Sequence, residues 1–169
     1  MAKTYLIDGH NLIGTGFFKG IDLEAEGDEA MLVDWLRARK TYLKGNVVVV
    51  FDHGIPGGTS RALSGGGVTV VFSSRKRTIA DNVILNRVRN SKTPGSITVV
   101  TNDGPVRTAA LRAGAKVLGA HAFISLIDNA AREQALARTR IQKEKPRLSR
   151  QEIDEFMQLF GGELAEGGE

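Results

Sequence analysis

The sequence contains no cysteine, and this absence excludes disulfide frameworks, thiol catalysis and metal sites with thiolate ligands. A metal ion would have to be bound by oxygen or imidazole ligands. Long hydrophobic runs are also lacking, because the longest, residues 47–51, is far too short to cross a membrane. Residues 1–4 lead into a short strand pattern without the apolar segment of a signal peptide. We therefore expect a cytoplasmic protein with no membrane attachment.

The 169 residues have an ordinary globular composition, with 41% hydrophobic and 25% charged residues. One domain with a short appendage is the expected organisation at this length. Residues 1–130 carry a net charge of +5, residues 131–150 again +5, and residues 151–169 a charge of −6. We predict a basic domain over residues 1–130. Residues 131–169 are predicted to hold a basic connector, a short amphipathic helix and a frayed acidic end.

Short β-branched runs alternate with longer amphipathic segments, which is typical of an α/β fold with a mostly parallel sheet. We predict strands over residues 4–7, 47–51, 68–72, 97–100 and 115–118. Helices are expected within residues 23–43, from about residue 78, from Asp103 as N-cap to about residue 113, and over residues 120–131 or on toward 140. Ser149 and Glu152 predict a capping box for the tail helix. The glycine-rich residues 53–67 are expected to form a mobile flap.

Four aspartates stand at comparable places in this pattern. Asp8, Asp52 and Asp103 follow predicted strands, and Asp81 lies near the start of a predicted helix. Because the C-terminal ends of parallel strands share one sheet edge, we expect the four carboxylates to converge there. Two carboxylates about 4 Å apart repel by roughly 4 kcal/mol at an effective dielectric constant of 20. A divalent cation relieves this repulsion, and Mg²⁺ or Mn²⁺ prefers such oxygen ligands.

Each aspartate also has a structural interpretation, as a turn residue or at a helix N-terminus. We favour a shared site, because all four would otherwise gather at one sheet edge without a common reason. Asn11 is a candidate to orient a carboxylate or a phosphate, since its amide group both donates and accepts hydrogen bonds.

Basic side chains near this edge predict contacts with phosphates. The candidates are Arg61 in the glycine-rich stretch and the run Arg75, Lys76 and Arg77. The sequence lacks the phosphate-binding loop G-x-x-x-x-G-K-[ST], the dinucleotide fingerprint and the nucleophile elbow G-x-S-x-G. Nucleotide-binding and acyl-transfer functions are therefore disfavoured.

Four segments together resemble a known family. They are LIDGHNLI at residues 6–13, VVFD at 49–52, TIADNVI at 78–84 and VVTND at 99–103. In this order they resemble the successive motifs of the NYN ribonucleases, and among these the YacP-like branch of the PIN-like nucleases, over residues 4 to about 130. The resemblance implies a PIN-like three-layer α/β/α fold with a C-terminal helical tail, and endonucleolytic cleavage of RNA with Mg²⁺ or Mn²⁺.

The resemblance also implies roles for particular residues. Asp8, Asp52, Asp81 and Asp103 occupy the family's acidic, metal-binding positions, and Asn11 its asparagine position. The implied substrate is single-stranded RNA, with messenger RNA as a candidate. A ribosome or an RNA-decay complex is a candidate partner.

Two departures from the family's pattern stand out. His10 occupies a position where the family usually has tyrosine. The basic run at residues 75–77 stands where relatives often carry an acidic residue. Glu29 and Asp34 are candidates to replace that acid, although a solvated helix charge is the simpler interpretation of each.

Two other functions stay open at this point. A non-catalytic RNA-binding module on the same scaffold would explain the basic connector but not the complete acidic set. A phosphoacceptor receiver domain is suggested by Asp52 after a hydrophobic strand, with Thr101 and Lys116. In a receiver domain the acceptor follows the third strand rather than the second, so this reading is disfavoured.

Overall fold

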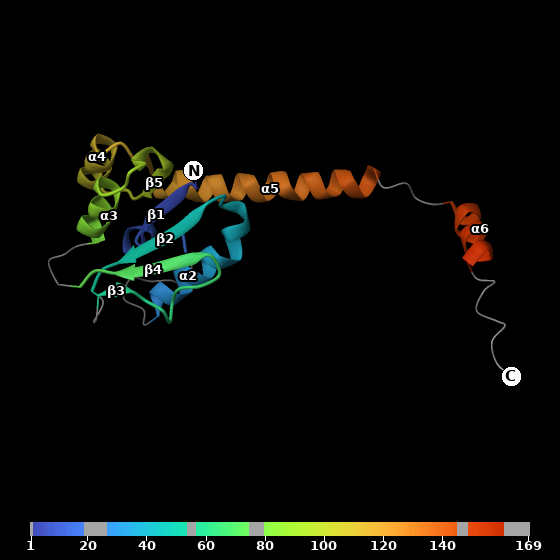
Figure 1. Cartoon of the computed structure of the whole chain (residues 1–169), viewed down its shortest axis with the longest axis horizontal. Helices are drawn as coiled ribbons and strands as arrows, with labels where there is room; N and C mark the ends of the chain where they lie inside the picture. The colour runs from blue at the N-terminus through green and yellow to red at the C-terminus, as the bar shows by residue number, and fades with distance from the viewer. Residues whose placement is uncertain (1, 19–26, 54–56, 75–79, 145–148, 161–169) are drawn as a thin grey trace. The chain divides into compact units, whose positions relative to one another are not determined.

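The computed structural model describes residues 2–18, 27–53, 57–74, 80–144 and 149–160 (Figure 1). The chain divides into two compact units, residues 1–131 and residues 132–169. Within the described ranges, no helix combines the length and the hydrophobicity that crossing a membrane requires.

A six-stranded sheet forms the centre of the first unit, with the strand order β3-β4-β2-β1-β5-β6. Every neighbouring pair is parallel except β3 and β4, which are antiparallel. The β-branched residues that fill the central strands suit a sheet covered on both faces. The strands are β1 (Thr4–Asp8), β2 (Asn46–Phe51), β3 (Gly58–Thr59), β4 (Val68–Phe72), β5 (Ile97–Val100) and β6 (Lys116–Leu118).

Helices cover both faces of this sheet and bury two separate cores. On one face, α1, α2 and the first turns of α5 pack against side chains such as Ile7 and Val49. On the other face, α3 and α4 pack against Leu6, Val50 and Val99. The helices are α1 (Gly9–Ile13), α2 (Asp28–Arg39), α3 (Ala80–Arg89), α4 (Gly104–Arg112), α5 (Ala120–Glu144) and α6 (Arg150–Phe160), with short 3₁₀ segments η1 (Lys40–Tyr42) and η2 (Pro94–Ser96). The predicted three-layer α/β/α fold is confirmed.

The predicted capping residues are confirmed. Oδ1 of Asp103 accepts a hydrogen bond from the Val106 amide at 2.9 Å, which begins α4. At α6, the Ser149 amide donates to Glu152 at 2.7 Å, and the Glu152 amide donates to Ser149 Oγ at 3.2 Å. Helix α5 continues past both predicted ends to Glu144. The predicted frayed end, residues 161–169, lies outside the described residues.

The described part of the predicted flap, residues 57–67, has defined partners. It contains strand β3, which pairs with β4, and a turn whose Ser64 Oγ accepts a hydrogen bond from the Val70 amide at 2.9 Å. Arg37 of α2 donates to the Leu63 carbonyl at 2.6 Å and to the Gly65 carbonyl at 3.3 Å. Side-chain hydrogen bonds therefore supply contacts that glycine cannot provide here, and the mobility of this segment stays a prediction.

Gly9 provides a test of how tightly α1 packs on the sheet. A Cβ atom at Gly9 would lie 2.2 Å from Cε1 of the buried Phe51 ring. We expect Gly9→Ala to destabilise the protein by about 1–3 kcal/mol in urea unfolding, because this core has no room for another carbon.

Gly104→Ala is the matched control, since a Cβ there would meet no atom within 4 Å. In a double-mutant cycle, Phe51→Leu should reduce the cost of Gly9→Ala. Equal costs in both backgrounds would contradict a steric origin.

Candidate functional site

The four predicted aspartates lie at the C-terminal edge of the parallel strands. Asp8 is the last residue of β1, which lies between β2 and β5 in the sheet. Asp52 directly follows β2, and Asp103 lies between β5 and α4. Asp81 is the second residue of α3 and belongs to its first turn. Segments that are far apart in sequence therefore bring the four side chains to one edge.

Three of these carboxylates are fixed by the first residues of helices. In each case Oδ1 accepts a hydrogen bond from a backbone amide, and such amides carry the partial positive charge of a helix N-terminus. The bonds run from Asn11 to Asp8 at 3.2 Å, from Ala80 to Asp52, and from Val106 to Asp103 at 2.9 Å. Among the described residues, no hydrogen bond is made to Oδ2 of Asp52 or Asp103.

The carboxylates act on one another electrostatically. Burial raises the pKa of Asp8 from 3.8 to about 6, and the charges of Asp81 and Asp52 contribute to the increase. Burial also raises the pKa of Asp81, with contributions from the charges of Asp103 and Asp52. All four aspartates are thus linked by repulsion within one region of negative charge.

The loop after β5 contributes uncharged partners that the sequence analysis did not assign to the acidic site. Thr101 Oγ1 donates to Asp8 Oδ2 at 3.3 Å and accepts from the Asp103 amide at 3.1 Å. Asn11 Oδ1 accepts from the Asn102 amide at 2.8 Å. The position of Thr101 and Asn102 directly after a strand was the available signal, because it places them at the same edge as Asp8.

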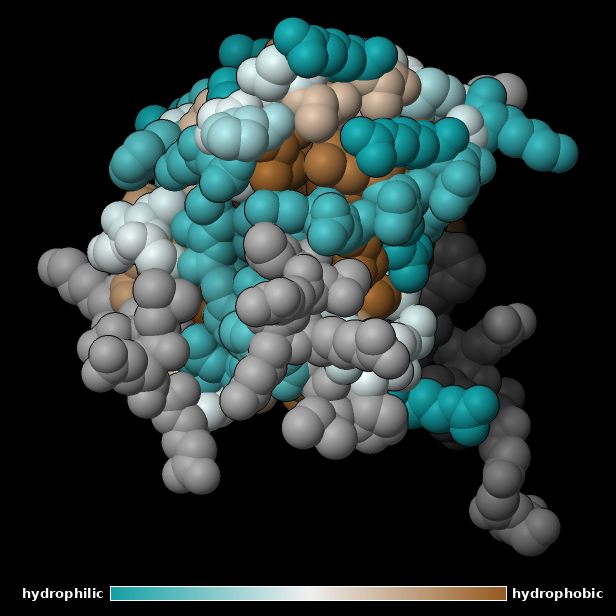
Figure 2. Space-filling model, turned by 90° about the vertical axis from the view of Figure 1, so that its left-hand side faces the viewer, coloured by the Kyte–Doolittle hydropathy of each residue, from teal (hydrophilic) through white to brown (hydrophobic). Residues whose placement is uncertain are grey.

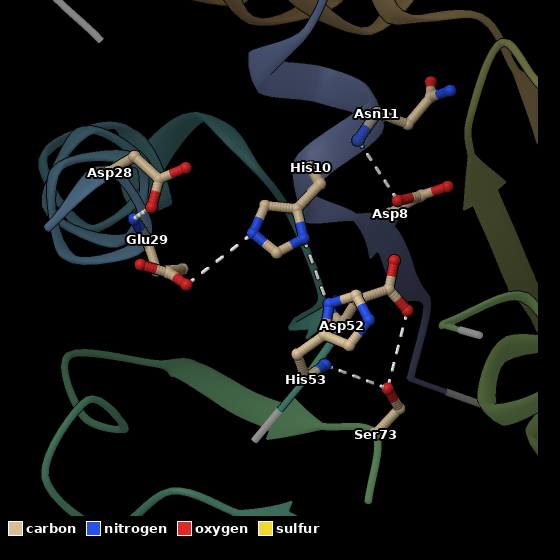
Figure 3. A network of polar contacts seen from close by, with 8 residues as sticks. All are labelled: Asp8, His10, Asn11, Asp28, Glu29, Asp52, His53 and Ser73. Carbon is tan, nitrogen blue, oxygen red and sulfur yellow. Dashed lines mark hydrogen bonds and ion pairs between the residues drawn. The ribbon is translucent and has the colours of Figure 1, made fainter. Parts of the chain in front are cut away.

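His10 lies between Asp52 and helix α2 (Figure 3). Its Nδ1 accepts a hydrogen bond from the Asp52 amide at 3.4 Å, and its Nε2 lies 3.6 Å from Glu29 Oε1. Glu29 is partly buried, so its interpretation as a solvated helix charge was wrong. Asp34 is exposed and pairs with Arg37 at 2.8 Å, in agreement with that interpretation.

His10, Asp28 and Glu29 could in principle form a metal site, since one ligand atom from each lies within 4.8 Å of the others. The hydrogen bond from the Asp52 amide to Nδ1 argues against this, because neutral His10 then carries its proton on Nε2. Burial raises the pKa of Asp28, and its side chain lowers the pKa of Glu29. We interpret the three residues as a polar cluster that fixes the backbone at the end of β2 through the contact of His10 with the Asp52 amide.

Of the basic candidate residues, only Arg61 lies within the described part of the chain. Arg61 is exposed in the turn after β3. Arg75, Lys76 and Arg77 lie outside the described residues. His53 is exposed and has a positive φ of 64°, and its amide donates to Ser73 Oγ at 3.3 Å.

The raised pKa of Asp8 predicts a pH-dependent stability in the absence of metal. The folded protein holds this proton up to about pH 6, whereas the unfolded chain releases it near 3.8. The folded state binds more protons between these values, so the free energy of unfolding should fall as the pH rises through them. Asp8→Asn should remove this contribution, worth about 3 kcal/mol, and stabilise the protein at pH 7 in EDTA.

Urea unfolding between pH 4 and 7.5 measures this effect. Asp128→Asn, at an exposed position of α5, is the control and should keep the wild-type profile. A wild-type stability that rises between pH 4 and 6, and an Asp8→Asn profile parallel to it, would contradict the assignment.

Comparison with known proteins gives a consistent picture. The model of the YacP-like NYN domain family matches residues 5–160. Two crystal structures of Rae1 (YacP) from Bacillus subtilis share the fold at 24% sequence identity. One has a TM-score of 0.62 and covers 99% of each chain. The other, of a point mutant, has a TM-score of 0.63 and covers 85% of this chain and 86% of that chain. No curated protein matches this sequence.

Proposed function

Because this chain belongs to the YacP-like NYN domain family, which is nuclease-like, we propose that it is an endoribonuclease dependent on Mg²⁺ or Mn²⁺. The proposed substrate is single-stranded cytoplasmic RNA, with messenger RNA as a candidate. The observation that carries the proposal is the group of four mutually repelling carboxylates at one edge of a parallel sheet.

The donor set fits a hard divalent cation. Helix amides bind Oδ1 of Asp8, Asp52 and Asp103, which fixes the orientation of these carboxylates. Hydrogen bonding within the described residues leaves Oδ2 of Asp52 and Asp103 available as ligands. Burial first, and then the charges of neighbouring aspartates, raise the pKa of Asp8 and Asp81, and no Lys or Arg of the described residues forms an ion pair with them. Carboxylate oxygens in this arrangement are the ligands that Mg²⁺ and Mn²⁺ prefer.

In this proposal Asp8, Asp52, Asp81 and Asp103 hold the cation, directly or through water. The bound ion would lower the pKa of an attacking water and offset charge that develops on the scissile phosphate. Asn11 holds the loop after β5 beside Asp8, so its role is to position Asp8 and Asp103. Thr101 has the same role through its contacts with both aspartates.

Phosphates on either side of the cleaved bond need partners of opposite charge. We assign this role to Arg61, Arg75, Lys76 and Arg77, which precede and follow β4 in the sequence. A ribosome or an RNA-decay complex is the proposed setting in which the substrate is presented.

The decisive test is cleavage of a labelled single-stranded RNA by the purified chain with Mn²⁺ and with EDTA. We expect cleavage only with Mn²⁺, and a loss of at least about 100-fold in Asp81→Asn, because a ligand is removed where transition-state charge is stabilised. Asp128→Asn is the matched control on an exposed helix face and should cleave like the wild type.

Thermal unfolding with Mn²⁺ separates this proposal from a non-catalytic RNA-binding module. The wild type should be stabilised by Mn²⁺ and Asp81→Asn much less. RNA binding without Mn²⁺ stabilisation and without cleavage would favour the module instead. Cleavage that persists in EDTA or in Asp81→Asn would refute the assigned site.

A further inference from the structure

A groove of about 770 Å³ runs along helix α4 on the first unit. Positions 104, 105, 108, 109, 112 and 113 line it, together with Arg89 at the end of α3. These positions are three pairs of neighbouring residues that repeat every four residues, so they lie on a single face of the helix. The groove therefore follows α4 from its first residue to its end, about 12 Å at 1.5 Å per residue.

Small residues form the floor of this groove. Gly104, Pro105, Thr108 and Ala109 supply little side-chain volume, and a Cβ atom at Gly104 would meet nothing within 4 Å. The Thr108 hydroxyl donates to the Gly104 carbonyl at 3.0 Å, so it lies along the helix.

Two arginines supply the charge of the groove. Arg89 and Arg112 are exposed, and neither forms an ion pair or hydrogen bond with a described residue. No described residue that lines the groove is acidic. Figure 2 shows the side of the first unit that carries α3 and α4, where hydrophilic side chains surround a smaller hydrophobic area. Planar guanidinium groups without an internal partner are well suited to bind phosphate.

The lining of the groove begins one residue after Asp103 of the candidate active site. Asp103 is the N-cap of α4 and immediately precedes Gly104, the first lining residue. Asp81 lies in the first turn of α3, and Arg89 ends the same helix. Both helices thus start at the acidic edge and end at an arginine, so the groove leads from the carboxylates toward the positive charges.

We propose that this groove binds the single-stranded RNA segment next to the scissile phosphate, with Arg89 and Arg112 on its backbone phosphates. This inference rests on the proposed nuclease function. A groove about 12 Å long that continues from the acidic edge is longer than one phosphate needs and suits an extended chain. The arginines also offset the repulsion that four aspartates impose on an approaching polyanion.

The test is the salt dependence of binding of a fluorescent single-stranded RNA to the full chain in EDTA, where cleavage is prevented. Each phosphate contact to a single strand contributes about 0.7 to the slope of log K against log salt concentration. Arg89→Gln with Arg112→Gln should therefore reduce the slope by about 1.4 and weaken binding roughly tenfold at 0.1 M salt. Thr108→Glu, which places a negative charge in the groove, should also weaken binding.

Arg138→Gln with Arg140→Gln is the matched control, because it removes the same charge from exposed positions of α5 that do not line the groove. Thermal unfolding should be unchanged in both double variants. The groove proposal is wrong if the two double variants lower the slope equally. It is also wrong if neither double variant lowers the slope while the wild type binds and cleaves RNA. In both cases the nuclease proposal stands. If the wild type neither binds nor cleaves RNA, both proposals fail.

Discussion

Repulsion between carboxylates at one sheet edge is the constraint on which the rest of this structure depends. Helix N-termini offset part of this repulsion. A backbone amide in the first turn of α1, α3 and α4 donates a hydrogen bond to one aspartate oxygen in each case. These contacts agree with the structural interpretation of three aspartates and also hold their carboxylates at one sheet edge. A residue that caps a helix can therefore serve a site as well, since a carboxylate has two oxygens.

The fold was largely predictable from the sequence because its strands are short, β-branched and buried on both faces. The strands at residues 68–72 and 97–100 were predicted with their observed bounds, and the other three were within a residue at each end. Helix α1 and strand β3 were missed for a physical reason. Helix α1 has five residues and strand β3 has two, which is too few to show a hydrophobic period, and both elements contain glycine. Tertiary contacts decide the conformation of such segments.

The acidic part of the candidate site was also predictable, because parallel strands end at a common edge. Its supporting contacts were not. The bonds of Thr101 to Asp8 and Asp103 depend on loop geometry that no periodic pattern encodes. The approach of Glu29 to His10 depends on how α2 packs on α1, and it replaced the expected solvated charge. The topology of the sheet determines where the charged side chains lie. The hydrogen bonds of neutral side chains depend instead on the local conformation of the backbone.

Two asparagines join parts of the chain that are synthesised at very different times. Asn11 accepts from the Asn102 amide, and Asn102 Oδ1 accepts from the Ala120 amide at 2.9 Å. Strand β1 likewise lies between β2 and β5, and β5 is synthesised long after β2. In a nascent chain the contact of Asn102 with α5 can form only after Ala120 has been synthesised. The hydrogen bonds that connect α1, the loop after β5 and the start of α5 therefore form only when most of the first unit has been synthesised.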